Sequence, residues 1–336
     1  MTPLLLLLIF SSLTVGSAST SAGVNLYTPK ADLIRYWNKE VKNNHAKPTF
    51  LLSKASPLSA VDAERFSKLA AQNALSSQFP AICPTANLLC LPDSSPTLQE
   101  LISHPNIIDF KLVWRQQGSF FRESMLKKGK VMTMPDIKDK MPERSFLPRS
   151  ISSKIPFSTS KISELKKIFH AEDNSTMETM IVEALNKCEK APSPGETERC
   201  VGSAEDMIDF AISILCRNIA VRSTENVKVS KQNIMIGSVK GINGGKVMQL
   251  VACHQTLFPY LLYSCHSVPK VRVYEVDILD PNSKAKINHG VASCHMHTSN
   301  SNPNHAELTI ASGPGQIRAC HWILVGKTQL IKGADH

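Results

Sequence analysis

The chain has 336 residues, which allows one large domain or two ordinary ones. Hydrophobic residues make up 42% of it, which is ordinary for a globular protein that builds a hydrophobic core. The formal net charge of +10 favours polyanionic partners, and no segment beyond the N-terminus is long and apolar enough to span a bilayer.

The N-terminal stretch MTPLLLLLIFSSLTVGSAST has the apolar run and the small residues of a secretory signal peptide, which we place at residues 1–18. An N-terminal membrane anchor is the alternative, although the run is shorter than the ~20 residues that a bilayer span needs. We therefore expect a secreted protein with neither a membrane nor a nucleic acid among its partners.

The nine cysteines are interpreted as disulfides rather than thiolate metal ligands, because the expected compartment is oxidising. Cys83 and Cys90 can close a small loop, and Cys188 and Cys200 flank a Pro/Gly turn. Cys216 is left over, and its apolar surroundings predict a buried free thiol. Two further bridges, in one of three connectivities, join Cys253, Cys265, Cys294 and Cys320.

Residues 24–95 form an N-terminal region with one clear amphipathic helix. Ser56 is its expected cap and Pro57 its expected first residue, since proline is tolerated in the first helical turn. Residues 96–117 look like a linker. From residue 118 to residue 330 we expect a second domain, which opens with a segment rich in proline and charge.

Within this second domain, helices precede strands. A helical pattern covers residues 160–170, and Ser175 and Ser203 are expected to cap the two helices that follow. Short segments rich in β-branched residues then alternate with turn signals, which predicts strands at 219–224, 233–242, 246–254, 270–279, 289–297, 306–311 and 316–322. The fold class is therefore α+β, with helices followed by a mostly antiparallel, disulfide-stabilised β-sheet system.

The dipeptide Cys-His occurs four times between residues 253 and 321. Neighbouring side chains on a strand point to opposite faces, so each cysteine would serve a disulfide on one face and each histidine would lie on the other. Imidazoles gathered in this way suit copper or zinc. A single histidine is more often a packed or hydrogen-bonded residue than a ligand. As candidate copper ligands we take His254, His266, His295 and His321.

Other local signals are weaker. A basic stretch, KLVWRQQGSFFRESMLKKGKV, suits either a polyanion such as acidic polysaccharide or a solvated face without a specific partner. Asn174 begins an N-glycosylation acceptor sequence. We find no Gly-x-Ser-x-Gly elbow, His-Glu-x-x-His motif or Gly-rich phosphate loop, so no hydrolase apparatus is indicated.

The four Cys-His pairs, with gaps of 10, 27 and 24 residues, resemble the signature of the plant BURP-domain family. The segments FFRESMLKKGKVMTMPDI and APSPGETERCVGSAEDMIDFA are also similar to that family. Upstream, YTPKADLIRYWNKEV, PTFLLSKASPLSAVDAERFSKLAAQNALSSQFP and ICPTANLLC resemble the non-catalytic beta subunits of polygalacturonase. The resemblance covers nearly the whole chain and assigns residues 118–330 to the BURP domain.

Two departures from the family stand out. The long array of Phe- and Tyr-bearing repeats that such beta subunits carry is replaced by residues 91–117. The family pattern also places a tryptophan nine residues after the last histidine, where this chain has Leu330. The second departure leaves open whether the last strand folds as it does in the family.

The resemblance implies a secreted, non-catalytic protein of the plant cell wall that associates with the catalytic subunit of polygalacturonase and acts on acidic pectin metabolism. One alternative is a copper-dependent peptide cyclase, although no repeated core peptide ending in Tyr or Trp is present. The other alternative is a structural wall protein without an enzyme partner.

Overall fold

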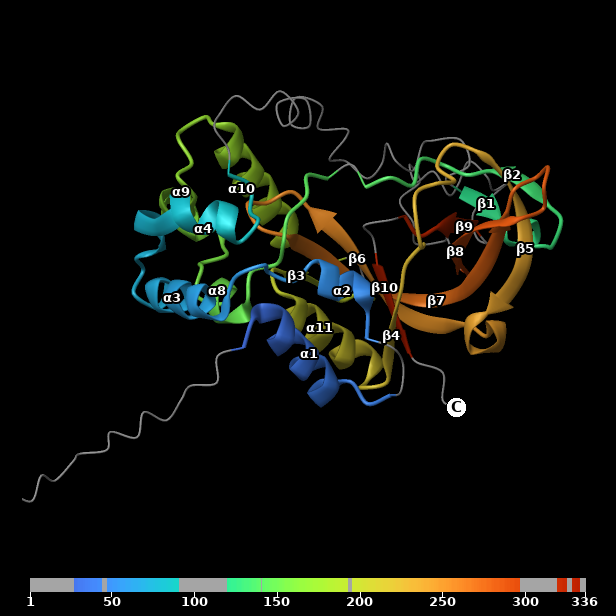
Figure 1. The fold of residues 1–336 in the computed structure, drawn as a ribbon, viewed down its shortest axis with the longest axis horizontal. Coiled ribbons are helices and arrows are strands. Elements are labelled where there is room, and N and C mark those ends of the chain that lie inside the picture. Colours follow the sequence, from blue (N-terminus) through green and yellow to red (C-terminus); the bar gives the residue numbers. More distant parts are fainter. Residues whose placement is uncertain are drawn as a thin grey trace, which may run out of the picture.

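The computed structural model describes residues 27–43, 47–90, 120–139, 141–192, 195–296, 319–324 and 328–332. Helices gather at one end of the molecule and most of the strands at the other, so the predicted α+β class is confirmed (Figure 1). The expected signal peptide, the linker and the strand at 306–311 lie outside the described residues.

The N-terminal region is helical because its apolar residues recur at helical spacing behind well-placed caps. Thr28 caps the first helix by accepting a hydrogen bond from the backbone N–H of Ala31. The third helix is capped by Ser59, not by Ser56, because residues 56–59 have no regular structure and the helix begins only at Ala60. The elements are α1 (Pro29–Glu40), α2 (Thr49–Ser53), α3 (Ala60–Ala71), η1 (Leu75–Gln78) and α4 (Phe79–Thr85).

The second group of helices begins as the sequence predicts. Ser175 accepts from the backbone N–H of Glu178, and Ser203 accepts from the backbone N–H of Asp206. Both hydroxyls satisfy an N–H group that the first helical turn leaves without an intrahelical partner. These helices are α8 (Arg149–Ser152), α9 (Ile162–Phe169), α10 (Thr176–Cys188) and α11 (Ala204–Leu215), with η3 (Thr159–Lys161) ahead of α9.

The described strands form one antiparallel sheet of ten strands, in the order β1-β9-β8-β7-β6-β10-β4, with β2, β3 and β5 attached to this path. The central strand is β7 (Leu262–Leu279), which begins eight residues before the predicted strand. The others are β1 (Phe120–Arg122), β2 (Val131–Thr133), β3 (Glu198–Val201), β4 (Ile219–Arg222), β5 (Asn233–Gly241), β6 (Met248–Thr256), β8 (Lys286–His295), β9 (Ala319–Trp322) and β10 (Thr328–Lys332). Two short 3-10 turns accompany them, η2 (Glu123–Met125) and η4 (Ile242–Gly245).

The sheet curls back on itself after β4. The backbone N–H of Glu225 donates to the carbonyl of His289, and the backbone N–H of Ile323 donates to the carbonyl of Val291. These bonds bring the end of β4 and the residues after β9 against β8, so the sheet encloses a small apolar interior. A hydrophobic cluster fills that interior, with members that include Leu250, Ala252, Val268, Val271, Val273 and Val291.

The last strand is well formed despite the departure from the family. Strand β10 pairs with β6 on one side and with β4 on the other. Leu330 is fully buried and belongs to the cluster that packs the sheet against α11. An aliphatic side chain therefore fills the position where the family pattern has tryptophan.

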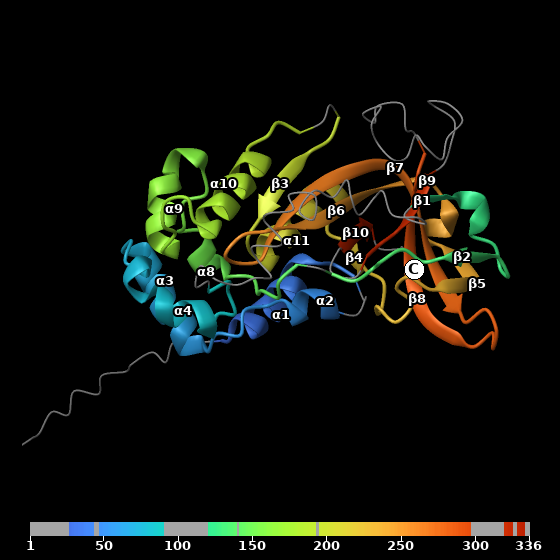
Figure 2. The same cartoon turned by 90° about the horizontal axis from the view of Figure 1, so that it is seen from above.

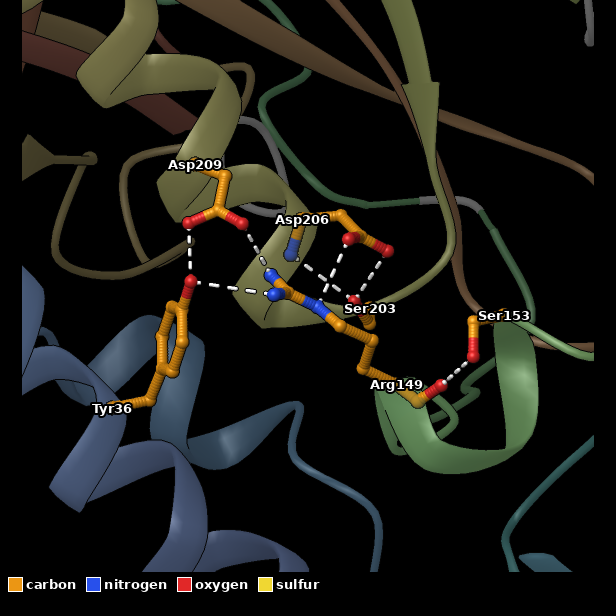
Figure 3. A network of polar contacts seen from close by, with 6 residues as sticks. All are labelled: Tyr36, Arg149, Ser153, Ser203, Asp206 and Asp209. Atoms are coloured by element: carbon orange, nitrogen blue, oxygen red, sulfur yellow. Dashed lines mark hydrogen bonds and ion pairs between the residues drawn. The ribbon is translucent and has the colours of Figure 1, made fainter.

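The N-terminal helices pack directly on the second group, and α1 lies beside α11 in both views (Figures 1 and 2). A polar network reinforces this contact (Figure 3). The Tyr36 hydroxyl, on α1, donates to the Asp209 carboxylate on α11. The guanidinium of Arg149 on α8 donates to Asp209 at 2.8 Å, and its Nε lies 3.0 Å from Asp206.

This network fixes the protonation of its tyrosine. Burial, followed by the hydrogen bond to Asp209, raises the pKa of Tyr36. Tyr36 therefore keeps its proton and acts as a donor. The network joins α1 and α11, which are far apart in sequence, around Arg149. Arginine suits this role because its planar guanidinium presents several donors at once.

Candidate functional site

The four Cys-His cysteines form two bridges between neighbouring strands. Cys253 on β6 lies directly opposite Cys265 on β7 and is bonded to it. Cys294 on β8 lies directly opposite Cys320 on β9 and is bonded to it. Of the three connectivities that the sequence allows, the structure has the one that joins each cysteine to the nearest partner along the chain.

The remaining cysteines divide into two bridges and one thiol. Cys83 is bonded to Cys90, and Cys188 is bonded to Cys200. Cys216 forms no bridge, and it is exposed rather than buried as the sequence predicted. It follows the last residue of α11 with a φ of 64°, so the chain turns away from the apolar face of that helix at this point.

Disulfides and histidines lie on opposite sides of the sheet. Cys253 and Cys265 pack in the cluster that faces α11, whereas Ala252 and Val268 belong to the cluster inside the curled sheet. Side chains alternate along a strand, so His254 shares the face of Ala252, and the same alternation places His266 with Val268.

The second disulfide follows the same rule. Cys294 and Cys320 pack with Trp322 in a third cluster, while Val291 and Ile323 belong to the interior cluster. His295 and His321 therefore also project from the face opposite their cysteines. The predicted division of the two residue types between the two faces is what the structure shows.

On that face the four histidines form two pairs rather than one group. The Nε2 atoms of His254 and His266 are 3.4 Å apart, and their rings stack with centroids 5.5 Å apart. The Nε2 atoms of His295 and His321 are 3.2 Å apart, and their rings stack at 5.3 Å.

The two pairs are separated along β7. His266 belongs to this strand, and His295 lies opposite Val271, five residues further along it. At the rise per residue of a β-strand, this spacing amounts to roughly 15 Å. Each pair is therefore a local feature of one strand–strand junction.

In each pair, one ring is held from its other nitrogen. The Nδ1 atom of His266 lies 3.5 Å from the Glu196 carboxylate, and the Nδ1 atom of His321 lies 3.2 Å from the carbonyl oxygen of Trp322. An Nδ1–H group that donates to such an oxygen fixes the tautomer and leaves Nε2 with a lone pair. In the tautomer that donates from Nδ1, either oxygen would hold its ring with Nε2 towards the partner histidine.

The geometry of each pair fits two ligands of one ion. Two imidazole nitrogens that bind a tetrahedral ion at about 2.0–2.1 Å lie roughly 3.3 Å apart, close to both observed separations. The cysteines are oxidised, so they offer no thiolate. Within the described ranges, no group of three or more His, Cys, Asp or Glu side chains is placed to hold a metal. Each pair thus supplies half of an ordinary coordination shell.

The predicted glycosylation residue, Asn174, lies exposed in the turn before α10. Its backbone N–H donates to the Glu178 carboxylate, and that carboxylate belongs to the capping arrangement at Ser175. The Asn174 side chain is therefore accessible, and its modification stays a prediction.

Sequence reasoning missed Glu196. It lies in the loop before β3, and β3 pairs with β7 so that Glu198 is opposite His266. This pairing brings the Glu196 carboxylate beside the imidazole. No sequence signal could have indicated the contact, because it depends on which strand adds to the edge of β7.

Comparison with known proteins identifies the family of the chain. The model of the BURP domain family matches residues 119–331, and the chain belongs to that family. BURP domain-containing protein 16 of Oryza sativa subsp. japonica is 43% identical over 338 residues, which cover 96% of this chain and 95% of that protein.

Subunits of polygalacturonase are more similar over a shorter stretch. Polygalacturonase-1 non-catalytic subunit beta of Solanum lycopersicum is 71% identical over 211 residues, which cover 62% of this chain and 34% of that protein. Polygalacturonase 1 beta-like protein 1 of Arabidopsis thaliana is 65% identical over 211 residues, with the same coverage. The chain matches about a third of the length of these relatives. None of the described helices is long and apolar enough to cross a membrane.

Proposed function

We propose that this protein is a secreted accessory protein of the cell wall that associates with the catalytic subunit of polygalacturonase and modulates pectin metabolism without catalysis of its own. The observation that carries the proposal is the 71% identity to a polygalacturonase non-catalytic subunit beta. The aligned region accounts for 62% of the chain.

The charge of the chain supports a pectic environment. A net charge of +10 attracts polygalacturonate, whose carboxylates are negative at neutral pH. The apolar N-terminal stretch and the four disulfides both suit export to an oxidising compartment. Taken together, these features support localisation in the apoplast.

The test is direct association. The purified protein is mixed with a polygalacturonase catalytic subunit and analysed by size-exclusion chromatography with light scattering. We expect a complex whose mass is the sum of the two proteins, and a reduced and alkylated sample of the same chain is the control. Separate elution at every concentration would contradict the proposal and favour a structural wall protein without an enzyme partner.

A second function is favoured by the histidine pairs. We infer that each pair binds one copper ion through two Nε2 atoms, with exogenous ligands completing the shell. Copper bound at the paired imidazoles would supply redox or Lewis-acid chemistry there. The residues of this chain orient the rings through Glu196 and the Trp322 carbonyl, and the disulfides hold the strands in register.

The copper stoichiometry tests this inference. We expect two ions per chain, with one lost in the double variant His254→Ala/His266→Ala and the other lost in His295→Ala/His321→Ala. The matched control is His170→Ala/His289→Ala, which changes two histidines outside the pairs. Equal stoichiometry in all variants would contradict the assignment.

The same samples address the peptide cyclase alternative. After incubation with copper in air, the intact mass of the chain is measured. The non-catalytic proposal predicts no change. A loss of two hydrogens that maps to a tyrosine or tryptophan would contradict it.

A further inference from the structure

Positive charge is concentrated in the sheet half of the molecule. Residues 218–295 contain nine Lys and Arg against four Asp and Glu. Residues 149–216, which include α8 to α11, contain eight Lys and Arg against eleven Asp and Glu. A polyanion is therefore drawn to the sheet and not to the α8–α11 helices.

Within the sheet half, one edge gathers lysines on a fixed scaffold. Strand β2 pairs with β5 and with no other described strand. The turn before it carries Lys127, Lys128 and Lys130, all exposed. Gly129, at φ 85°, donates its N–H to the carbonyl of Ile236, and Ile236 donates back to the carbonyl of Lys130. These two bonds hold the turn against β5.

The opposite end of the same edge carries three more lysines. Lys231 donates its backbone N–H to the carbonyl of Pro135, and Ile137 donates its N–H to the Ser230 hydroxyl. Lys138 and Lys228 flank these contacts and are exposed. Along the chain, Lys231 and Ile236 are five positions apart, so the two ends are separated by at most roughly 17 Å.

Little of this charge is neutralised by the protein. Lys231 forms an ion pair with Asp136, a carboxylate that is only 6% exposed and also accepts from Ser230. For the other five lysines, no ion pair is found within the part of the chain that the structure describes. Between the two ends, Val131 is 48% exposed and offers an apolar contact.

We propose that this β2 edge binds a linear polycarboxylate, namely the de-esterified galacturonan of pectin. The edge comprises Lys127, Lys128, Lys130, Val131, Lys138, Lys228 and Lys231. The inference rests on the proposed function for the choice of polymer, because that proposal supplies the pectic surroundings. An extended polymer of like charges can reach the lysines at both ends of β2, whereas methyl-esterified pectin has lost the carboxylates that these lysines attract.

The test removes three lysines from the β2 edge and compares the result with an equal change of charge elsewhere. The variant, called the row variant below, is Lys127→Gln/Lys128→Gln/Lys130→Gln. The matched control is Lys161→Gln/Lys167→Gln/Lys190→Gln, three exposed residues on or beside the helices. Both variants lose the same net charge, and thermal unfolding shows whether each is folded.

Binding of a defined unesterified oligogalacturonate is measured by calorimetry at low ionic strength. We expect the row variant to bind at least about tenfold more weakly, because it loses three positive charges that face the anionic polymer. The control variant stays within about twofold of the unmodified protein, and a fully methyl-esterified oligomer binds to none of the three.

Three results would overturn the inference. In one, the row variant binds as tightly as the unmodified protein. In another, the two variants weaken equally, so that net charge alone matters. In the third, the unmodified protein does not bind the oligomer at all.

Association with the polygalacturonase catalytic subunit is measured in parallel on the same variants. We expect the row variant to retain it. A protein that joins the enzyme but ignores the oligomer keeps the proposed function and loses this inference. A row variant that loses the enzyme while keeping the oligomer assigns the edge to the protein partner and also overturns the inference.

Discussion

At the scale of single residues, the Cys-His dipeptide separates two functions because neighbouring side chains on a strand point apart. The sequence predicted this division of cysteines and histidines between the two faces. Cys253 belongs to one cluster, whereas Ala252, which lies on the same face as His254, belongs to another. It did not predict that the histidines form two pairs, because that outcome depends on which strands are neighbours. Nor did it predict Glu196, which reaches His266 from a separate loop.

Asp277 on β7 provides a prediction about pH. Lys286, Ser238 and His289 surround its carboxylate, and the hydrogen bonds from Lys286 and Ser238 lower its pKa to about 2. A carboxyl whose pKa is lower in the folded state stabilises the fold above its unfolded pKa of about 4, and this contribution is lost as the pH falls towards 2.

We therefore expect Asp277→Asn to lower the free energy of unfolding by about 1 kcal/mol at pH 6, after discounting for solvent screening of a partly exposed group. The difference between the variant and the unmodified protein should shrink as the pH falls from 4 to 2. Urea unfolding across this range is the measurement. A difference that is constant with pH would show that the carboxylate charge plays no part.

At the scale of elements, strands with clear alternation and β-branched residues were predicted well, as β5 and β8 show. The first part of β7 was missed because YLLYSC is a continuous apolar run without alternation, buried on both faces. For strand β10 the only indication was the family resemblance, because its five residues carry too little periodicity to predict a strand. Its position between β6 and β4 comes from tertiary pairing.

The close packing of β8 against its neighbours predicts that a methyl group added at Gly290 destabilises the fold. A Cβ atom at Gly290 would meet Ile278 Cδ1 at 2.7 Å and Trp322 Cζ3 at 2.9 Å. Both side chains are buried, so they have little room to move. We expect Gly290→Ala to destabilise the protein by about 1–3 kcal/mol, measured by chemical unfolding.

The matched control for this prediction is Gly244→Ala, where no atom lies within 4 Å of the added Cβ. Gly244 has a φ of 64°, so its substitution reports backbone strain without a steric clash. If Gly290→Ala destabilised less than this control, the tight packing of β7, β8 and β9 would be contradicted.

The docking of α1 on α8 and α11 gives a prediction for the network in Figure 3. Tyr36→Phe keeps the ring under the Arg149 guanidinium, 4.9 Å from its centroid, and removes only the hydroxyl. We expect a loss of about 1 kcal/mol, because Asp209 loses one donor. Unfolding of Tyr36→Phe, Arg149→Lys and the double variant gives the coupling energy.

Because both residues contact Asp209, the two losses should be non-additive by at least about 0.5 kcal/mol. Tyr27→Phe, at an exposed tyrosine ahead of α1, is the control and should change nothing. Strict additivity would mean that the two side chains act on the docking independently.

At the scale of the whole molecule, the N-terminal region and the BURP domain form one packed body. The largest clusters draw on both, as Phe66 and Phe258 in one cluster and Trp37 and Tyr263 in another show. Sequence resemblance identified both regions but could not show that they share a core, because the contacts join residues more than a hundred positions apart.

The uneven charge of the molecule predicts how polygalacturonate binding responds to salt. Attraction between exposed charges is screened over about 10 Å at 0.1 M salt and over about 30 Å at 0.01 M. We expect the affinity to fall steeply between these two concentrations, measured by calorimetry with sodium chloride as the only variable. Affinity that does not change with salt would contradict a charge-driven contact.

The two histidine pairs depend most directly on which cysteines are joined, because the bridges link the neighbouring strands that carry the histidines. Peptide mapping of the purified protein without reduction measures this. We predict bridges 253–265 and 294–320, together with 83–90 and 188–200, and an unbridged Cys216. A bridge from either of Cys253 and Cys265 to either of Cys294 and Cys320, or free thiols at these four positions, would contradict the account.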